Sequence, residues 1–311
     1  MSALDRPDPG QALPFASTRS TPSSVPRLTL RTDEDGRAVW CRIAGGARRT
    51  LTPGLLEEVS QAYAAMRAGS APGEVPQFLV LDGDPNGAFS LGLDLQGLAG
   101  LIRLGDRNTL RAYLSAYAGV LHGTAEALGL PLVTLALLRG DALGAGLELA
   151  LACDLVVAER GSRFGFAEAL LGLPDTGASL LVGRRLGPER AQDIVRSGRV
   201  YGAEELHELG LVDVLAEPGQ GEAVVRETLA KVARRYNAQQ AVYQVKRRVS
   251  PIARDDVQDL VEGWVEAALA LGPAGRRTFE RLALVQGSPD PSSAATDLGQ
   301  VSPPVGWSVF G

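Results

Sequence analysis

Two glutamates in the middle of the chain have the residue type and the surroundings that acid–base chemistry needs. Glu148 ends the glycine-rich run 140–148, and Glu168 follows the apolar segment 164–167 and precedes the turn at 172–177. Burial among apolar residues disfavours the charged form of a carboxylate and raises its pKa toward neutrality. A glutamate in that state both accepts and donates a proton near neutral pH, so the pair predicts a general acid–base centre.

The glycines around Glu148 favour this interpretation over a plainer one. A single glutamate at the start of a helix more often stabilises the helix dipole or faces water. Here Gly144 and Gly146 precede the apolar stretch 149–158, which is interrupted only by Asp154. Glycines at the start of a helix let backbone N–H groups point outward together, and such groups bind anions and stabilise a developing oxyanion. We therefore expect an oxyanion-binding turn beside the acid–base pair.

Composition is typical of a soluble globular protein from a reducing compartment. The chain has 311 residues, 45% of them hydrophobic and 22% charged, with a formal net charge of −5, which argues against a nucleic-acid partner. No stretch reaches the ~18 apolar residues of a transmembrane helix, and residues 1–26 lack the apolar core of a signal peptide. Cys41 and Cys153 form no metal or redox motif and are expected to be buried free thiols. We predict a cytoplasmic protein that does not bind membranes.

Histidine is scarce, which limits the catalytic classes open to the chain. His122 and His207 are the only two, and neither neighbours the glycine-rich turns. A histidine-based zinc site and a Ser–His–Asp triad are therefore disfavoured, and no Gly-x-Ser-x-Gly elbow is present. We therefore expect no metal site built on histidine.

Apolar runs alternate with segments of helical periodicity along the chain. Strands are predicted at 27–31, 39–43, 78–81, 132–138, 155–158 and 211–215. Helices are predicted from Thr52–Pro53 onward, after the turn at 140, and at 94–128, 178–197, 203–209, 221–235, 238–248, 255–271 and 274–286. This alternation predicts an α/β layered fold with a mainly parallel sheet.

Composition also divides the chain into four parts. Residues 1–26 are rich in Pro, Ser, Asp and Thr and are expected to form a disordered arm, and 288–311 a flexible tail. Between them we predict an α/β core at 27–250 and a helical region at 251–287 that forms a lid or an oligomer interface. The helix at 255–271 carries an apolar stripe suited to core or subunit packing.

Four groups of residues, in this order and spacing, resemble the crotonase (enoyl-CoA hydratase/isomerase) superfamily. They are 86–95 (NGAFSLGLDL), 140–154 (GDALGAGLELALACD), 164–177 (FGFAEALLGLPDTG), and 201–205 with 210–213 (YGAEE and GLVD). Together they cover roughly residues 30–250. The resemblance implies a crotonase-like spiral of βαβ units in the 27–250 core, assembled into trimers or into hexamers of paired trimers.

A narrower resemblance is to the bacterial synthases of diffusible signal factors, which are cis-2-unsaturated fatty acids. It is carried by the helical sequence that begins at 101–107 (LIRLGDR), and by 264–268 (WVEAA) with 276–282 (RRTFERL). This resemblance extends to about residue 286. It implies that the thioester is also hydrolysed, which releases a free fatty acid.

The superfamily resemblance implies a substrate and roles for particular residues. The substrate is an acyl thioester on CoA or acyl carrier protein, and its carbonyl oxygen accepts hydrogen bonds from two backbone N–H groups. By position these N–H groups belong to Leu93 and Ala145, and the two superfamily glutamates fall on Glu148 and Glu168. The implied substrate-binding positions are Gly92, Gly144, Gly146, Phe164 and Gly177.

Two positions depart from the superfamily pattern. Leu93 is larger than the small residue common after that glycine, so the acyl channel is expected to be reshaped. Ala167 stands where a proline is common before the second glutamate. Neither change removes a backbone N–H group from the implied oxyanion hole.

The implied reaction is elimination of water from a 3-hydroxyacyl thioester, or its reverse, through an enolate held in the oxyanion hole. This implied reaction needs no metal ion and no redox cofactor. By resemblance Glu168 acts at the α-carbon and Glu148 on the water, although the sequence alone assigns neither role. Two alternatives stay open. One is an enoyl-CoA hydratase/isomerase of a specialised lipid or polyketide pathway. The other is a non-catalytic homologue that binds acyl thioesters or a partner protein.

Overall fold

A mainly parallel sheet lies at the centre of the protein. The computed structural model describes residues 27–43, 49–69, 75–85, 87–166 and 171–287. The main sheet contains β1 (Leu28–Thr32), β2 (Ala38–Ile43), β3 (Phe78–Asp82), β4 (Val133–Leu138), β6 (Leu155–Glu159) and β9 (Val214–Ala216). They are ordered β1-β2-β3-β4-β6-β9, and β1 is antiparallel to β2 while the other neighbours are parallel. A smaller sheet contains β5 (Ala142–Leu143), β7 (Arg163–Gly165) and β8 (Val200–Gly202).

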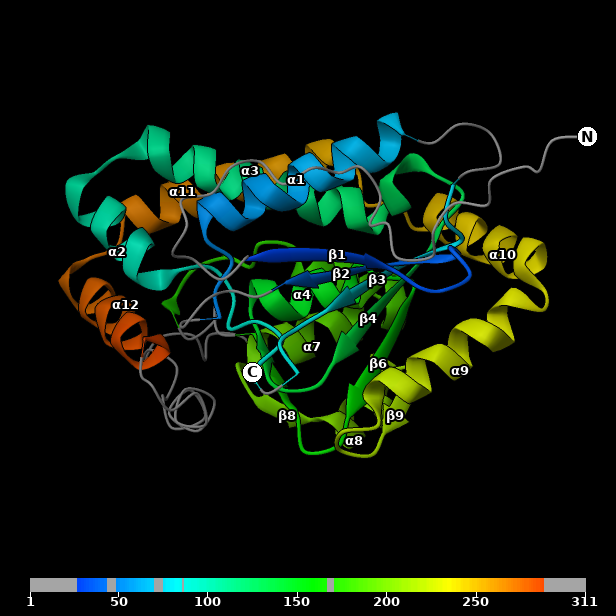
Figure 1. Ribbon diagram of the computed structural model, residues 1–311. Coiled ribbons are helices and arrows are strands. Elements are labelled where there is room, and N and C mark those ends of the chain that lie inside the picture. Colours follow the sequence, from blue (N-terminus) through cyan, green and yellow to red (C-terminus); the bar gives the residue numbers. More distant parts are fainter. Residues whose placement is uncertain (1–26, 44–48, 70–74, 86, 167–170, 288–311) are drawn as a thin grey trace, which may run out of the picture.

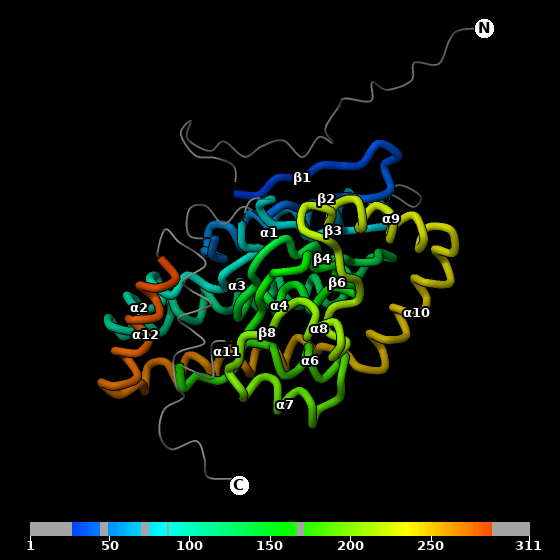
Figure 2. Tube along the Cα trace, turned by 90° about the horizontal axis from the view of Figure 1, so that it is seen from below, coloured from blue at the N-terminus to red at the C-terminus, as the bar shows by residue number. Residues whose placement is uncertain are grey.

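Helices cover both faces of the main sheet (Figure 1). In chain order they are α1 (Pro53–Ala68), α2 (Leu95–Leu104), α3 (Arg107–Ala125), the short 3₁₀ turn η2 (Ala127–Gly129), α4 (Ala145–Leu151), α6 (Ala178–Leu186), α7 (Pro188–Ser197), α8 (Ala203–Leu209), α9 (Gly221–Ala233), α10 (Tyr236–Val249), α11 (Arg254–Leu269) and α12 (Pro273–Gln286). Helices α1 and α3 lie on one face, and α9 packs on β4 and β6 from the other. Helices α2 and α12 pack side by side at the end of the molecule away from α10, as Figures 1 and 2 both show. The predicted α/β fold with a mainly parallel sheet is confirmed.

Alternating residues of the central strands supply two hydrophobic cores. On β2, Val39 and Cys41 belong to the larger cluster under α1 and α3, whereas Ala38 and Trp40 belong to the smaller cluster under α9. Successive side chains of a strand point to opposite faces, so a strand that is buried on both faces reads as a continuous apolar run. Both cysteines are buried free thiols, as expected, and burial raises the pKa of the Cys41 thiol to about 12.

The predicted helix at 94–128 is wrong in one respect, because the structure breaks it into α2 and α3. Gly105 ends α2 in the left-handed conformation, with a φ of 67°. The next residue, Asp106, caps α3, since its carboxylate accepts from the backbone N–H of Thr109 at 3.1 Å. A glycine and a capping aspartate in sequence end one helix and begin the next. The segment 178–197 is also divided, at Gly187, which has a φ of 87°, and Pro188 begins α7.

The apolar stripe on 255–271 packs inside the chain. Helix α11 packs along α3, and Val257, Val261, Trp264, Val265 and Ala268 are all buried. Ion pairs of Arg107 with Glu266 and of Arg111 with Glu262 flank this contact. The stripe therefore gives no support to a subunit interface, and the trimer stays a prediction from the superfamily resemblance alone.

The proposed division into four parts also stays a prediction. The arm at 1–26 and the tail at 288–311 lie outside the described residues. In the described part of the chain, no helix has both the length and the apolar character that crossing a membrane would require.

Candidate active site

Two loops meet at the carboxyl ends of β3 and β4, which is where open α/β sheets bind ligands. The loop after β3 runs beside the turn after β4: Ser90 N–H donates to Asp141 O at 3.3 Å, and Leu143 N–H donates to Ser90 O at 2.9 Å. A Cβ atom on Gly146 would lie 2.5 Å from Ser90 O, so only glycine fits at this crossing. The two glycine-rich segments that were singled out in the sequence are therefore in direct contact.

A hydrogen bond to the carbonyl of Gly92 orients the Gly92–Leu93 peptide. Gly92 has a φ of 87°, which favours glycine, and its carbonyl accepts from Leu51 N–H at 2.8 Å. Within one planar trans peptide the C=O and N–H bonds point in opposite directions, so the Leu93 N–H points away from Leu51. A Cβ atom on Gly92 would lie 3.5 Å from the backbone nitrogen of Ala145, so this peptide approaches the second predicted donor closely.

Ala145 is the first residue of α4, where backbone N–H groups have no acceptor inside the helix. Gly144 precedes it with a φ of 49° and is itself held by a hydrogen bond from its N–H to Gly165 O at 2.8 Å. Among the described residues, no acceptor contacts the N–H of Leu93 or of Ala145. Two unused N–H donors thus lie at the predicted oxyanion hole.

Glu148 lies one turn into α4 and has no exposed surface. Its Oε2 accepts hydrogen bonds from the hydroxyls of Tyr117 at 2.5 Å and Thr176 at 2.8 Å. Its Oε1 accepts from the backbone N–H of Ala178 at 3.1 Å. These donors are neutral, and two of them are hydroxyls, which can accept as well as donate. These three contacts therefore suit both the carboxylate and the protonated form of Glu148.

Tyr117 and Thr176 were not among the predicted site residues. Tyr117 projects from α3, and its hydroxyl also lies 3.2 Å from the carbonyl oxygen of Ala145. One turn earlier on α3, the Tyr113 hydroxyl accepts from Asp94 N–H at 2.8 Å and donates to Leu51 O at 2.5 Å. The sequence did contain a signal for these contacts: two tyrosines lie four residues apart on an apolar helix face. A buried tyrosine hydroxyl needs a polar partner, so this spacing indicates polar groups packed against that face.

The other predicted residues differ in how closely they approach Glu148. A Cβ atom on Gly177 would lie 3.5 Å from Glu148 Oε2, which places this glycine against the carboxylate. Phe164 is fully buried in β7, between Ala142 and Tyr201, so its described contacts are those of a core residue. Its contact with substrate stays a prediction. Glu168 lies outside the described residues, so its predicted position beside Glu148 stays a prediction as well.

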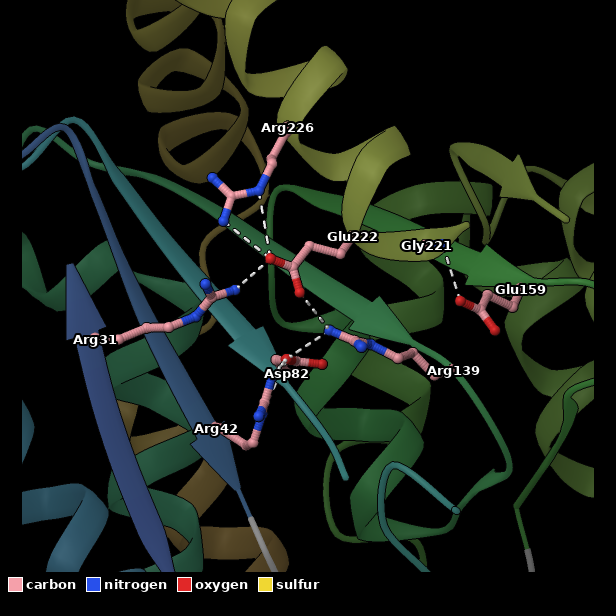
Figure 3. A network of polar contacts seen from close by, with 8 residues as sticks. All are labelled: Arg31, Arg42, Asp82, Arg139, Glu159, Gly221, Glu222 and Arg226. Atoms are coloured by element: carbon pink, nitrogen blue, oxygen red, sulfur yellow. Dashed lines mark hydrogen bonds and ion pairs between the residues drawn. The ribbon is translucent and has the colours of Figure 1, made fainter. Parts of the chain in front are cut away.

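A second buried carboxylate ends β3 (Figure 3). The Oδ2 atom of Asp82 accepts from Arg42 at 3.0 Å and from Arg139 at 2.9 Å. Burial raises the pKa of Asp82, and the two guanidinium groups counteract this in part. Arg139 also contacts Glu222 of α9 at 3.3 Å. This charged cluster joins β2 and the end of β3 to the residue after β4, so Asp82 and Arg139 directly precede the two loops of the site in the chain.

Glu222 extends the cluster toward the surface. Its carboxylate accepts from Arg31 at 2.7 Å and from Arg226 at 2.9 Å. Partial desolvation raises its pKa, but the two arginines outweigh this effect and bring the pKa of Glu222 to about 2. As to metal ligands, the described parts of the chain contain no group of three or more His, Cys, Asp or Glu side chains that could hold an ion.

Comparison with known proteins gives a consistent result. A family model described as enoyl-CoA hydratase/isomerase matches residues 46–262, more than half of the chain. A putative enoyl-CoA hydratase of Thermus thermophilus is 30% identical over 200 residues, which cover 62% of this chain and 77% of that protein. The mitochondrial methylglutaconyl-CoA hydratase of Mus musculus is 29% identical over 184 residues, which cover 58% of this chain and 55% of the mouse protein. The chain thus spans about half the length of the mouse relative.

Solved structures show the same fold. An enoyl-CoA hydratase from Bacillus halodurans superposes with a TM-score of 0.69 at 23% identity, covering 82% of this chain and 100% of that one. A putative polyketide biosynthesis enoyl-CoA hydratase from Bacillus subtilis gives a TM-score of 0.64 at 19% identity, covering 83% of this chain and 97% of that one. The expected crotonase-like architecture is confirmed.

Proposed function

Because this chain belongs to the enoyl-CoA hydratase/isomerase family, we propose that it adds water to a 2-enoyl thioester or removes water from a 3-hydroxyacyl thioester. One observation carries the proposal. Glu148, a fully buried carboxylate held by hydroxyl groups, lies one turn from the unused N–H of Ala145, and the unused N–H of Leu93 belongs to the peptide beside it. Acid–base catalysis next to an oxyanion hole is what reversible hydration of a thioester requires.

In the dehydration direction, the proton on the α-carbon moves to one carboxylate and the thioester becomes an enolate. The N–H groups of Leu93 and Ala145 stabilise the negative charge on the enolate oxygen. The enolate then reforms its carbonyl as the bond from the β-carbon to its hydroxyl breaks, and the second carboxylic acid protonates the departing hydroxyl to give water. In our proposal Glu168 takes the α-proton and Glu148 protonates the leaving group. The hydroxyls of Tyr117 and Thr176 stay in contact with Glu148 as its proton leaves and returns.

The burial of Glu148 has a consequence for substrate binding. Its side chain has no exposed surface, and Tyr117 and Thr176 are also buried. At least one neighbouring group therefore moves when an acyl chain reaches this carboxylate. Enclosure excludes bulk water from the enolate and strengthens the electrostatic interactions within the site.

The narrower proposal is that the enzyme also hydrolyses the thioester, on CoA or acyl carrier protein, and releases a cis-2-unsaturated acid. The two segments that carry the resemblance to diffusible-signal-factor synthases lie together, since α2 packs on α12 and α3 on α11. In this step a water activated by a carboxylate attacks the carbonyl carbon, the same N–H groups hold the tetrahedral oxyanion, and the thiol of the carrier leaves. Support for this step is the resemblance alone.

Product analysis tests both levels of the proposal. The purified protein is incubated with 2-enoyl-CoA thioesters of several chain lengths, and separately with 3-hydroxyacyl thioesters of CoA and of acyl carrier protein. Mass spectrometry then follows gain or loss of water and release of free acid. Hydration or dehydration without free acid supports the general proposal and contradicts the narrower one. Absence of turnover on every thioester contradicts both and favours a binding protein.

Ala145→Pro tests the oxyanion hole within this experiment. It deletes one N–H at the first position of a helix, where proline is well tolerated. Loss of one oxyanion donor lowers kcat by about 10²–10³-fold. Normal turnover by a folded Ala145→Pro protein would place the oxyanion hole elsewhere.

A further inference from the structure

The last residue of α12 contacts the loop that carries Leu93. Gln286 is 8% exposed, and its carboxamide makes three hydrogen bonds to backbone atoms of that loop. Its Nε2 donates to Leu91 O at 2.8 Å and to Leu93 O at 2.9 Å. Its Oε1 accepts from Leu95 N–H at 2.9 Å. One side chain about two hundred residues further along the chain thus satisfies two carbonyls and one N–H of the segment 91–95.

These contacts bracket the Gly92–Leu93 peptide. The peptide before it is held at its carbonyl by Gln286 and at its N–H by the hydroxyl of Ser90, 3.2 Å from Gly92 N. The peptide after it is held at its carbonyl by Gln286 and at its N–H by the hydroxyl of Tyr113. Both neighbours are therefore fixed at both ends, which leaves the Gly92–Leu93 peptide one orientation, with an N–H that no described residue accepts.

We propose that Gln286 is a positioning residue of the oxyanion hole, which fixes the direction of the Leu93 N–H by holding the peptides on either side of it. This inference rests on the proposed function, because it assumes that Leu93 N–H binds a thioester oxygen. It makes the end of α12, at the far end of the chain from the loop, a part of the active site.

The packing of α12 alone does not explain why residue 286 carries a carboxamide group. Helix α12 is already anchored by Phe279 and Leu282, which are buried, and by the edge-on contact of Phe279 with Trp264. An apolar side chain at 286 would serve docking equally well, whereas a buried amide that meets three backbone groups specifies one loop conformation. Oxyanion donors act only when they are preorganised, and a displacement of about 1 Å lowers rates by about 10²-fold.

The test compares Gln286→Met and Gln286→Glu with the control Leu282→Ala. Methionine keeps the length of the side chain and removes all three hydrogen bonds, while glutamate loses both N–H donors and sets an oxygen against two carbonyls. Leu282→Ala weakens the packing of α12 and leaves the loop contacts in place. We expect both Gln286 variants to lower kcat by about 10- to 100-fold with a smaller change in KM. We expect Leu282→Ala to lower thermal stability with kcat of the folded fraction unchanged.

A binding measurement reports on the carbonyl contact without turnover. The affinity for a saturated acyl-CoA thioester is divided by the affinity for the S-alkyl-CoA thioether that lacks the carbonyl. This ratio should fall in Gln286→Met and stay constant in Leu282→Ala. A ratio unchanged in Gln286→Met, or a loss of kcat equal in Gln286→Met and Leu282→Ala, overturns the inference.

Amide hydrogen exchange of residues 90–95 separates this inference from the proposed function. If the wild type neither binds nor converts acyl-CoA, the proposed function fails, and exchange then decides the structural claim. Faster exchange at 90–95 in Gln286→Met alone supports the role of Gln286 in holding the loop. Equal exchange in Gln286→Met and the wild type overturns it.

Discussion

Glu148 and Asp82 are both fully buried carboxylates, and they differ in what surrounds them. The described partners of Glu148 are two hydroxyls and a backbone N–H, all of them neutral. The described partners of Asp82 are the guanidinium groups of Arg42 and Arg139. A hydroxyl both donates and accepts, whereas a guanidinium only donates and keeps its charge.

This difference separates a carboxylate suited to chemistry from one suited to structure. When Glu148 gains a proton, Tyr117 can turn its own proton toward the carbonyl of Ala145, 3.2 Å away, and accept from the acid. When Asp82 gains a proton, two guanidinium groups lose the negative charge that compensates them. Proton transfer at Glu148 therefore leaves these three hydrogen-bonding groups in place, while at Asp82 it breaks a buried ion pair.

The largest effect is expected from Glu148→Gln. The amide keeps the shape of the side chain and its acceptor for Ala178 N–H, and the hydroxyls of Tyr117 and Thr176 accept from its NH₂ group. Thermal stability should therefore change little, while kcat falls by about 10²–10⁴-fold because a positioned acid–base group is lost. Melting temperature and hydration rate are measured on the same samples. Full activity in this variant would exclude Glu148 from the reaction.

Asp82→Asn is the matched change at the other carboxylate. Loss of one partner of a buried pair costs about 3–5 kcal/mol, and the partial exposure of Arg42 places this variant near the lower value. We expect urea unfolding to show about 3 kcal/mol of destabilisation, with kcat of the folded fraction unchanged. A normal unfolding midpoint together with reduced kcat would reverse the roles assigned to the two carboxylates.

Tyr117→Phe tests whether the hydroxyl partner of Glu148 contributes to the reaction. It removes a hydroxyl that can donate to the carboxylate of Glu148 and accept from its protonated form. We therefore expect kcat to fall by about 10-fold with little change in KM. Tyr63→Phe is the control, because Tyr63 is an equally buried tyrosine whose hydroxyl contacts Thr124 at 2.8 Å, away from Glu148. Both variants lose a buried hydrogen bond worth about 1 kcal/mol. Equal kcat values in the two variants would mean that Tyr117 contributes packing alone.

The smallest effect concerns pH and the charged cluster of Asp82. The pKa of Glu222 is lowered from 4.5 to about 2, so its contribution to stability is present above pH 4.5 and is lost as the pH falls from 4.5 toward 2. Glu222 is partly exposed, so solvent screening limits the contribution to about 1 kcal/mol or less. Denaturant unfolding of the wild type and Glu222→Gln should differ above pH 4.5 and converge as the pH approaches about 2. Parallel curves over this range would show that Glu222 is not stabilised by its arginines.

Most of the fold was predictable because its signals are local. The apolar runs at 78–81 and 132–138 became β3 and β4, and Thr52 with Pro53 marked the start of α1. The break between α2 and α3 also has a local signal, which is Gly105 followed by Asp106. The helical periodicity that continues through 94–128 hid this signal. The apolar stripe on α11 was visible in the sequence. Its packing against α3 was not, because that contact joins segments far apart in the chain.

The positions of the candidate site residues could be predicted in part: the sequence pointed to the two backbone segments and to Glu148, but not to the side chains around them. Gly92, Leu93, Ala145 and Glu148 lie in motifs whose spacing is visible in the sequence. Tyr117, Thr176 and Gln286 reach the site through contacts that span many residues, and no local pattern encodes such contacts. The position of Glu168 stays a prediction.

Because both cysteines are buried, the rate at which a thiol reagent labels them measures how often the protein opens. Cys41 lies in β2 under α1, and Cys153 follows α4, and neither thiol is accessible in the folded protein. Burial also raises the pKa of each thiol, which disfavours the thiolate that reacts with alkylating reagents and disulfides. Modification therefore proceeds through opened molecules, and the labelling rate of each cysteine at native conditions reports the opening frequency of its own region.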